Sequence, residues 1–166
     1  LGSDALALVN AQLTALTTDN VGGLATASLA AMNSAQVAAL GSDASVLGTA
    51  ALAALNTLNI TGLTAGAITA MTSAQIAALG SDVSAMNVTQ LAALGADNIL
   101  GLTTASLAVL TTAQVAALGA DAGSMGSAQL AALTSANAAG LATSALAALT
   151  SNNIAGLSSV AIPMLS

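Results

Sequence analysis

An eight-residue repeat, shortened to seven residues in one unit of five, runs through the whole chain and limits what it can fold into. The units that start at Leu24, Met71 and Leu110 read LATASLAA, MTSAQIAA and LTTAQVAA. Position 1 is Leu or Met, and position 6 is a branched apolar residue in almost every unit. These sixth positions are Leu13, Val21, Leu29, Val37, Leu52, Ile60, Ile68, Ile76, Leu91, Ile99, Leu107, Val115, Leu130, the weak member Ala138, Leu146, Ile154 and Ile162. A fixed period of this kind is typical of a solenoid, in which each unit packs on its neighbours.

The seven-residue units set a second, longer period. They start at residues 1, 40, 79 and 118, which are 39 residues apart, and we interpret them as corners. The chain divides into four repeats, 1–39, 40–78, 79–117 and 118–156, and 157–166 begins a fifth repeat or forms a terminal segment. Because equivalent residues of a solenoid stack on one another, we expect one 39-residue repeat in each coil.

The spacing of the apolar positions favours helices over strands. Position 6 and the next position 1 are three residues apart, which puts them on one face of a helix but on opposite faces of a strand. Two threonines and the glutamines three residues later match the capping box that starts helices: Thr72 with Gln75, and Thr111 with Gln114. One long helix is excluded, because eight residues advance about 800° and the apolar row would wind around it. We therefore predict an all-α solenoid whose 39-residue coil holds four very short helices or two longer ones, with a β-solenoid as the alternative.

The composition excludes most classes of function. The chain has no Lys, Arg, His, Cys, Trp, Tyr or Phe, and its only titratable side chains are six aspartates. Acid–base and nucleophilic catalysis need a tuned base or a cationic neighbour, and zinc sites need Cys or His. Nucleic acids are bound by Lys, Arg and aromatic side chains. We predict that the protein is not an enzyme, has no cofactor and binds no nucleic acid.

A high mean hydropathy of +0.91 raises the question of a membrane span. Residues 44–81 and 122–166 carry no charge, but polar residues or glycine interrupt every apolar run. One of the longest apolar runs is Ala50–Leu55. A helix that crosses a membrane needs roughly 20 mainly apolar residues. The sequence therefore predicts no membrane span.

Neither end of the sequence has a polar cap. Residue 1 is already in phase with the repeat, no signal peptide is visible, and we expect the chain to be a piece of a longer one. The first unit starts LGSDAL like an internal unit, and residues 160–165 read VAIPML. Repeat proteins normally close their ends with polar units. We therefore expect the ends to be covered by self-association or by flanking repeats of the same chain.

Two sets of residues recur at the 39-residue period and are candidate sites. Stacked carboxylates would offer oxygen ligands to Ca²⁺, although the simpler role of each is to cap or charge a helix start; this set is Asp4, Asp43, Asp82 and Asp121. Stacked amides would form a hydrogen-bonded ladder; this set is Asn20, Asn59, Asn98 and Asn137.

Three weaker patterns complete the candidates. Stacked hydroxyls would form a flat face for ice or a glycan, although helix starts also favour hydroxyls; these pairs are Asn33-Ser34, Thr72-Ser73, Thr111-Thr112 and Thr150-Ser151. The five methionines are expected to fill the core; they are Met32, Met71, Met86, Met125 and Met164. Asn59-Ile60-Thr61 and Asn87-Val88-Thr89 match the glycosylation pattern, which a chain rich in Asn and Thr also matches by chance.

The units LTTAQVAAL from Leu110 and MTSAQIAAL from Met71 resemble the Leu-Thr-Thr-Ala-Gln-Val-Ala-Ala-Leu repeats of very large bacterial secreted and surface proteins, often labelled adhesins. The resemblance covers essentially the whole chain and specifies no functional residues. It implies export and an extracellular or cell-surface place. We expect a non-catalytic structural protein of a fibre, sheath, stalk or surface layer; the alternatives are an ice- or glycan-binding module and a Ca²⁺-stiffened adhesin stalk.

Overall fold

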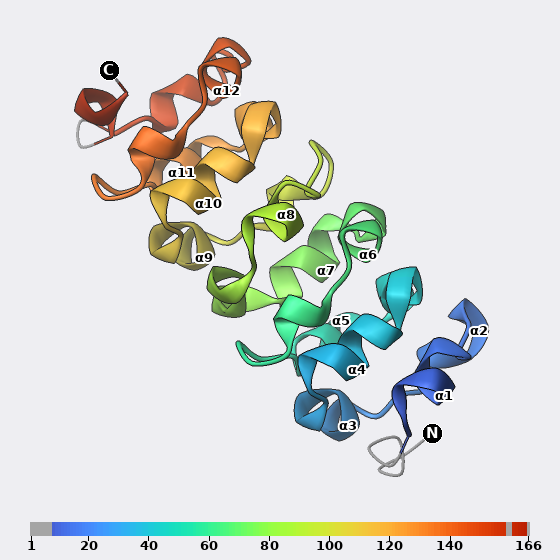
Figure 1. Ribbon diagram of the computed structural model, residues 1–166. Coiled ribbons are helices and arrows are strands. Elements are labelled where there is room, and N and C mark those ends of the chain that lie inside the picture. Colours follow the sequence, from blue (N-terminus) through green and yellow to red (C-terminus); the bar gives the residue numbers. More distant parts are fainter. Residues whose placement is uncertain (1–7, 159–160, 166) are drawn as a thin grey trace.

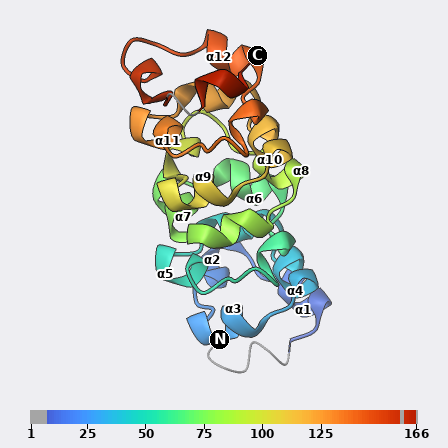
Figure 2. The ribbon, with the colours of Figure 1, turned by 90° about the vertical axis from the view of Figure 1, so that its left-hand side faces the viewer.

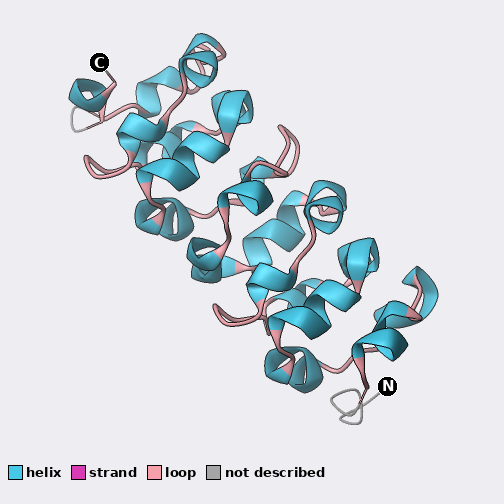
Figure 3. Cartoon of the chain, in the orientation of Figure 1, coloured by secondary structure: helices cyan, strands magenta, loops and turns pink. Residues whose placement is uncertain are grey.

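The computed structural model describes residues 8–158 and 161–165, and these form short α-helices and 3-10 helices joined by tight turns, with no strand (Figures 1 and 3). The α-helices are α1 (Asn10–Thr14), α2 (Thr18–Val21), α3 (Thr26–Ala31), α4 (Ser34–Ala39), α5 (Thr49–Leu52), α6 (Ala65–Ala70), α7 (Ser73–Ala78), α8 (Val88–Leu91), α9 (Thr104–Val109), α10 (Thr112–Ala117), α11 (Ser127–Ala131) and α12 (Thr143–Ala147). The 3-10 helices are η2 (Gly41–Val46), η3 (Ile60–Gly62), η4 (Gly80–Ala85), η5 (Ile99–Gly101), η6 (Gly119–Ser124), η7 (Ala138–Gly140), η8 (Ile154–Gly156) and η9 (Ile162–Met164). The all-α prediction is confirmed, and the β-solenoid alternative is wrong for these residues.

Each unit of the sequence folds into one short helical segment and then turns. Position 1 has an extended backbone in most units, as at Met71 (φ −71°, ψ 147°), and this residue redirects the chain. Position 2 then caps the next helix: Thr72 Oγ1 accepts a hydrogen bond from the Gln75 backbone N–H, while the Thr72 N–H donates to Gln75 Oε1 at 2.8 Å. Thr111 and Gln114 make the same reciprocal pair. Both predicted capping boxes are confirmed, and they explain why the helices are restarted every eight residues.

Three units, not five, complete one coil. Each element packs on the element three units further along the chain, so α1 lies on α4 and α4 lies on η3. The first side of the solenoid consists of α1, α4, η3, η4, α9, α11 and η8. The second side consists of α2, η2, α6, α8, α10, η7 and η9, and the third of α3, α5, α7, η5, η6 and α12. The coils form a single column from the N-terminal to the C-terminal end (Figure 2).

The 39-residue coil of the sequence interpretation is therefore wrong, although the solenoid of short helices is confirmed. A coil contains 24 residues, or 23 where it includes a seven-residue unit, and it holds three helical segments rather than two or four. The physical reason is the size of the core. A six-residue segment is only about 9 Å long, so three of them enclose a space that Leu, Ile and Met side chains fill. Five would leave an interior void, which packed proteins avoid.

Because five units recur in sequence while three make a coil, equivalent positions fall on a different side in each successive repeat. The seven-residue units form η2 on the second side, η4 on the first and η6 on the third. They are not the corners, since every unit boundary is a turn. Their shortening depends on a left-handed glycine: Gly41, Gly80 and Gly119 have φ of 57–58°, a conformation that other residues adopt at a cost. Contacts run across the boundaries at 39/40, 78/79 and 117/118 without a break.

The core is built from positions 1 and 6, as predicted. Position 1 is buried from Leu24 to Leu141, and four of the five methionines occupy it, with Met164 as the exposed exception. Position 6 is buried from Leu13 to Ala138, after which burial fails: Leu146 is half-buried and Ile154 is 52% exposed. In the last unit Ala161 is buried and Ile162 is exposed, so Ile162 is not the core residue that the eight-residue register assigned to it. The last coil thus has an uncovered face.

Candidate functional site

The most repeated chemical feature of the molecule is a side-chain amide at position 5 that joins one coil to the coil before it. The amide oxygen accepts from the backbone N–H of position 2 in its own unit. The amide NH₂ donates to two backbone carbonyls, 30 and 27 or 28 residues earlier, which flank a turn of the preceding coil. The residues that make both donations are Asn59, Gln75, Gln90, Asn98, Gln114, Gln129, Asn137 and Asn153.

Asn98 shows the geometry of such an amide bridge. Its Oδ1 accepts from the Gly95 N–H at 2.9 Å, and its Nδ2 donates to the carbonyls of Ile68 at 2.8 Å and Met71 at 3.2 Å. The side chain is 4% exposed. A hydrogen bond of this kind contributes about 0.5–1.5 kcal/mol, whereas the unpaired buried group would cost more. The described residues contain no buried side-chain N or O atom without a partner, so stacking leaves none of these side-chain groups unpaired.

The four asparagines of the predicted ladder are not brought together. Asn59, Asn98 and Asn137 belong to units on the first, third and second sides, and each binds backbone carbonyls rather than another asparagine. Asn20 lies in the first described coil, is exposed, and pairs only through its Oδ1 with the Thr17 N–H. The ladder is thus replaced by separate amide bridges. Sequence reasoning also missed the glutamines as bridges, although their recurrence at position 5 was the available signal.

Glycine at position 8 of the asparagine units lets consecutive coils approach closely. A Cβ at Gly62, Gly101 or Gly140 would lie 2.1–2.3 Å from a backbone carbonyl of the helix beneath it, those of Ser34, Ser73 and Thr112. No heavy atom fits at that distance, so these positions exclude every other residue in this packing. Gly23, the equivalent residue of the first coil, has only the carbonyl of its own Asn20 nearby, at 3.3 Å.

The aspartates of the predicted Ca²⁺ column are spread around the solenoid. Asp43, Asp82 and Asp121 lie on the second, first and third sides, in the first turns of η2, η4 and η6, with no side-chain capping bond to those segments. Asp4 lies outside the described residues. Within the part of the chain that is described, no three carboxylates or other metal-ligating side chains gather in one place. The geometry therefore brings no Ca²⁺ ligand set together.

The Ser/Thr pairs are dispersed in the same way. The pairs that begin α4, α7 and α10 lie on the first, third and second sides, so they form no flat hydroxyl face. Of the two glycosylation sequons, Asn59 is buried and donates both amide hydrogens, so it is inaccessible in the folded chain. Asn87 is exposed and caps α8 by accepting from the Gln90 N–H at 3.0 Å.

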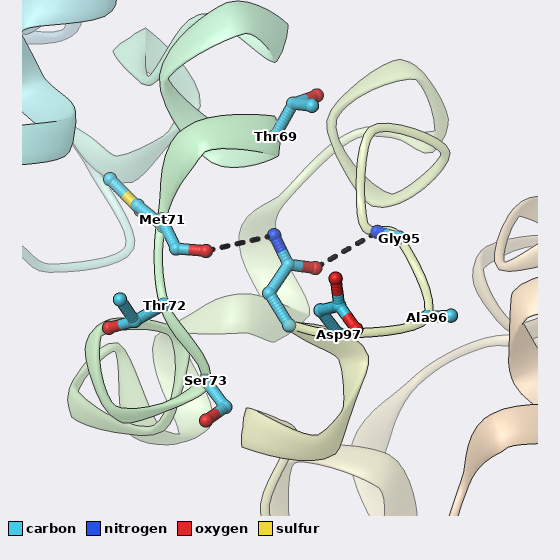
Figure 4. A pocket seen from close by; sticks show the side chains of 8 residues that line it. Thr69, Met71, Thr72, Ser73, Gly95, Ala96 and Asp97 are labelled. Carbon is cyan, nitrogen blue, oxygen red and sulfur yellow. Dashed lines mark hydrogen bonds between the residues drawn. The ribbon is translucent and has the colours of Figure 1, made fainter.

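One hollow of about 520 Å³ lies where the Asn98 bridge joins α6 and α7 to the 95–98 turn. Its polar lining consists mainly of Thr69, Thr72, Ser73 and Asp97 (Figure 4). The Thr69 hydroxyl is already bonded to the Ala93 carbonyl and the Thr72 hydroxyl to Gln75. The carboxylate of Asp97 is exposed, and no cationic side chain lines the hollow. The hollow lies at the junction of two consecutive coils.

Helices in the described part of the chain are all too short to cross a membrane. Comparison with known proteins gave no relative: no family model matches the chain, and no curated protein or solved structure is similar to it. The class that the fold defines is an α-solenoid with three short segments per coil and amide bridges between coils.

Proposed function

We propose that this protein is a non-catalytic structural element of an extracellular fibre, sheath, stalk or surface layer. The observation that carries the proposal is the continuity of the stack. The same contact, between units three apart, is made along the whole described chain, and the same amide bridge recurs at most levels. Such a column has no natural length, because any number of units extends it by the same interface.

The chemistry of the surface supports this role. Charged side chains make up 4% of the residues, and all of them are Asp. The described aspartates are spread over the three sides, although Asp19 and Asp43 lie in consecutive units of the second side and Asp97 and Asp121 in consecutive units of the third. With six carboxylates in 166 residues, repulsion along the column is low. Large apolar side chains such as Leu58 and Val109 are exposed, and single exposed apolar residues are ordinary on a protein surface. The resemblance of the repeats supports an extracellular bacterial location.

The alternative functions lose their geometric basis. Ice or glycan recognition by the Ser/Thr pairs requires them on one face, and stiffening by Ca²⁺ requires the aspartates in one column. Both sets change sides in each repeat, because the repeat and the coil differ in length. Neither alternative is proposed.

Two measurements test the proposal. Immunogold electron microscopy of cells that produce the protein should place the label outside the cell, on fibres or a continuous layer. Label confined to the cytoplasm would contradict the proposed role.

A chain with one extra 39-residue repeat, inserted after residue 117, should give a rod longer by about 15 Å in small-angle X-ray scattering. That figure assumes five thirds of a coil and helix packing distances of about 8–10 Å. An unchanged length would show that the stack is not additive.

A further inference from the structure

One of the two glycosylation sequons is exposed along its whole length and takes no part in the hydrogen bonds between described coils. Asn87, Val88 and Thr89 are consecutive exposed residues on the second side of the solenoid. Asn87 has an extended backbone, with φ −77° and ψ 168°, and lies at the turn between η4 and α8. The sequence Asn-x-Ser/Thr is the acceptor of N-linked sugars, which exported proteins carry on their surface. This sequon therefore has both the sequence and the location of an acceptor.

The side-chain amide of Asn87 is held by its oxygen and leaves its nitrogen available. Oδ1 accepts from the Gln90 N–H at 3.0 Å, and the Asn87 N–H donates to Gln90 Oε1 at 2.9 Å. Nδ2 donates to none of the described residues, and the Thr89 hydroxyl binds none of them either. N-glycosylation replaces one Nδ2 hydrogen and keeps Oδ1, so the modified residue would still cap α8.

The second sequon shows what the stacking of coils excludes. Asn59 is 0% exposed, and its Nδ2 donates to the carbonyls of Leu29 at 2.9 Å and Met32 at 3.0 Å. A sugar on this nitrogen would replace one of the two bonds and would need space between coils that are closely packed. If transfer precedes folding, a chain modified at Asn59 cannot form this contact. If transfer follows folding, the transferring enzyme cannot reach the nitrogen. Of the two sequons, only the one at Asn87 is compatible with the folded column.

We propose that Asn87 is an N-glycosylation site and that its sugar projects from the second side of the column. The co-substrate is an activated sugar that carries a diphosphate on its anomeric carbon. Asn87 Nδ2 forms a bond to this carbon while the bond from the carbon to the diphosphate oxygen breaks. The diphosphate leaves with the electron pair of that bond, and one Nδ2 proton passes to a base of the transferring enzyme. The sugar covers Val88, which is 49% exposed, with a solvated polar group. This inference rests on the export that the proposed function includes.

Mass spectrometry of the protein isolated from the cells that produce it tests the site, because aspartates separate the two sequons. After denaturation in urea, an endoprotease that cuts before Asp releases peptide 43–81, which contains Asn59, and peptide 82–96, which contains Asn87. Peptide 82–96 should be heavier by one or more sugar residues, and fragment masses should place this increment on Asn87. Peptide 43–81 should have the mass of its sequence. A single monosaccharide identifies a nucleoside diphosphate sugar as the donor, and an oligosaccharide identifies a lipid-linked diphosphate.

Two variants and a matched control complete the test. Thr89→Ala destroys the exposed sequon but keeps both hydrogen bonds between Asn87 and Gln90, and Asn87→Ser keeps a capping oxygen but removes Nδ2. Each should abolish the increment completely. The control is Thr61→Ala, which destroys the buried sequon at another exposed threonine and should leave the increment on peptide 82–96 unchanged.

Four results would overturn the proposal: a peptide 82–96 without sugar, an increment located on Thr89, an increment that persists in Thr89→Ala, or a sugar on peptide 43–81. External label in microscopy would then leave the proposed function standing. Label confined to the cytoplasm, together with a sugar on Asn87, would contradict the proposed function and leave the modification site standing.

Discussion

The contribution of one amide bridge is measurable, because the chain contains the same residue with and without its cross-coil bonds. Asn98 and Asn20 have the same place in the 39-residue repeat and both accept from a backbone N–H three residues earlier. Asn98 also donates to Ile68 and Met71, whereas the Asn20 amide donates to none of the described residues. Asn20→Ala should cost about 1 kcal/mol of unfolding free energy, as for a lost helix cap.

Asn98→Ala should cost about 3–4 kcal/mol, because two cross-coil bonds of about 1 kcal/mol each are lost and the Met71 carbonyl is left unpaired in a closed site, while the Ile68 carbonyl keeps only the Met71 N–H. The assay is urea unfolding followed by circular dichroism at 222 nm, with the slope m compared between variants. Equal destabilisation by the two substitutions at an unchanged m would refute the claim that the amide bridges hold the coils together. A lower m for Asn98→Ala alone would show that the column has come apart into separately unfolding halves, as a one-dimensional stack allows.

Three further outcomes follow from the packing. Gly101→Ala should lower the free energy of unfolding by at least about 2 kcal/mol, because its Cβ would lie 2.1 Å from the Ser73 carbonyl. Gly66→Ala has open space in α6 and should raise the free energy of unfolding by up to about 1 kcal/mol. Equal effects of the two substitutions in urea unfolding would contradict the close approach of the coils. Gly80→Ala should cost about 1–2 kcal/mol through its φ of 57°, with no steric contribution, and a thermal melt that matches the unmodified chain argues against a left-handed residue in the seven-residue unit. The folded chain should survive a nonspecific protease in native buffer, since cleavage requires opened states, and rapid digestion into small fragments on a gel argues against a continuous stack.

Much of this fold could be predicted from the sequence, because the dominant forces are local. The three-residue step from position 6 to the next position 1 identifies helices and the core, and Leu13 to Ala138 lie where this pattern puts them. Helix starts were predictable from Thr72 and Thr111, whose caps use residues only three positions away.

The number of units in a coil could not be predicted from the same pattern. The 39-residue period shows which units have similar sequences. The number of units in a coil depends instead on how many short helical segments can surround a core without leaving a void. A repeat of five units and a coil of three units share no common factor, so Asn59 and Asn98 recur in sequence but lie on different sides. Their true partners, the carbonyls of Leu29 and Ile68, are backbone groups that leave no trace in the residue pattern. The side-chain amide at position 5 of most units was a clue. When such an amide is buried, its NH₂ group needs hydrogen-bond acceptors, and backbone carbonyls of the neighbouring coil can supply them.

The three-unit coil is the central claim, and paired cysteines test it most directly because the chain has no natural cysteine. Thr69 Oγ1 lies 3.0 Å from the Ala93 carbonyl, 24 residues away, whereas Ala108 lies one 39-residue repeat after Thr69 and on another side. The double variant Thr69→Cys with Ala93→Cys should form an intramolecular disulfide, or react within one chain with a short bis-maleimide. Thr69→Cys with Ala108→Cys should do neither, as judged by intact mass under dilute conditions. Rapid closure of the 69/108 pair and not of the 69/93 pair would contradict the three-unit coil and restore a coil of one 39-residue repeat.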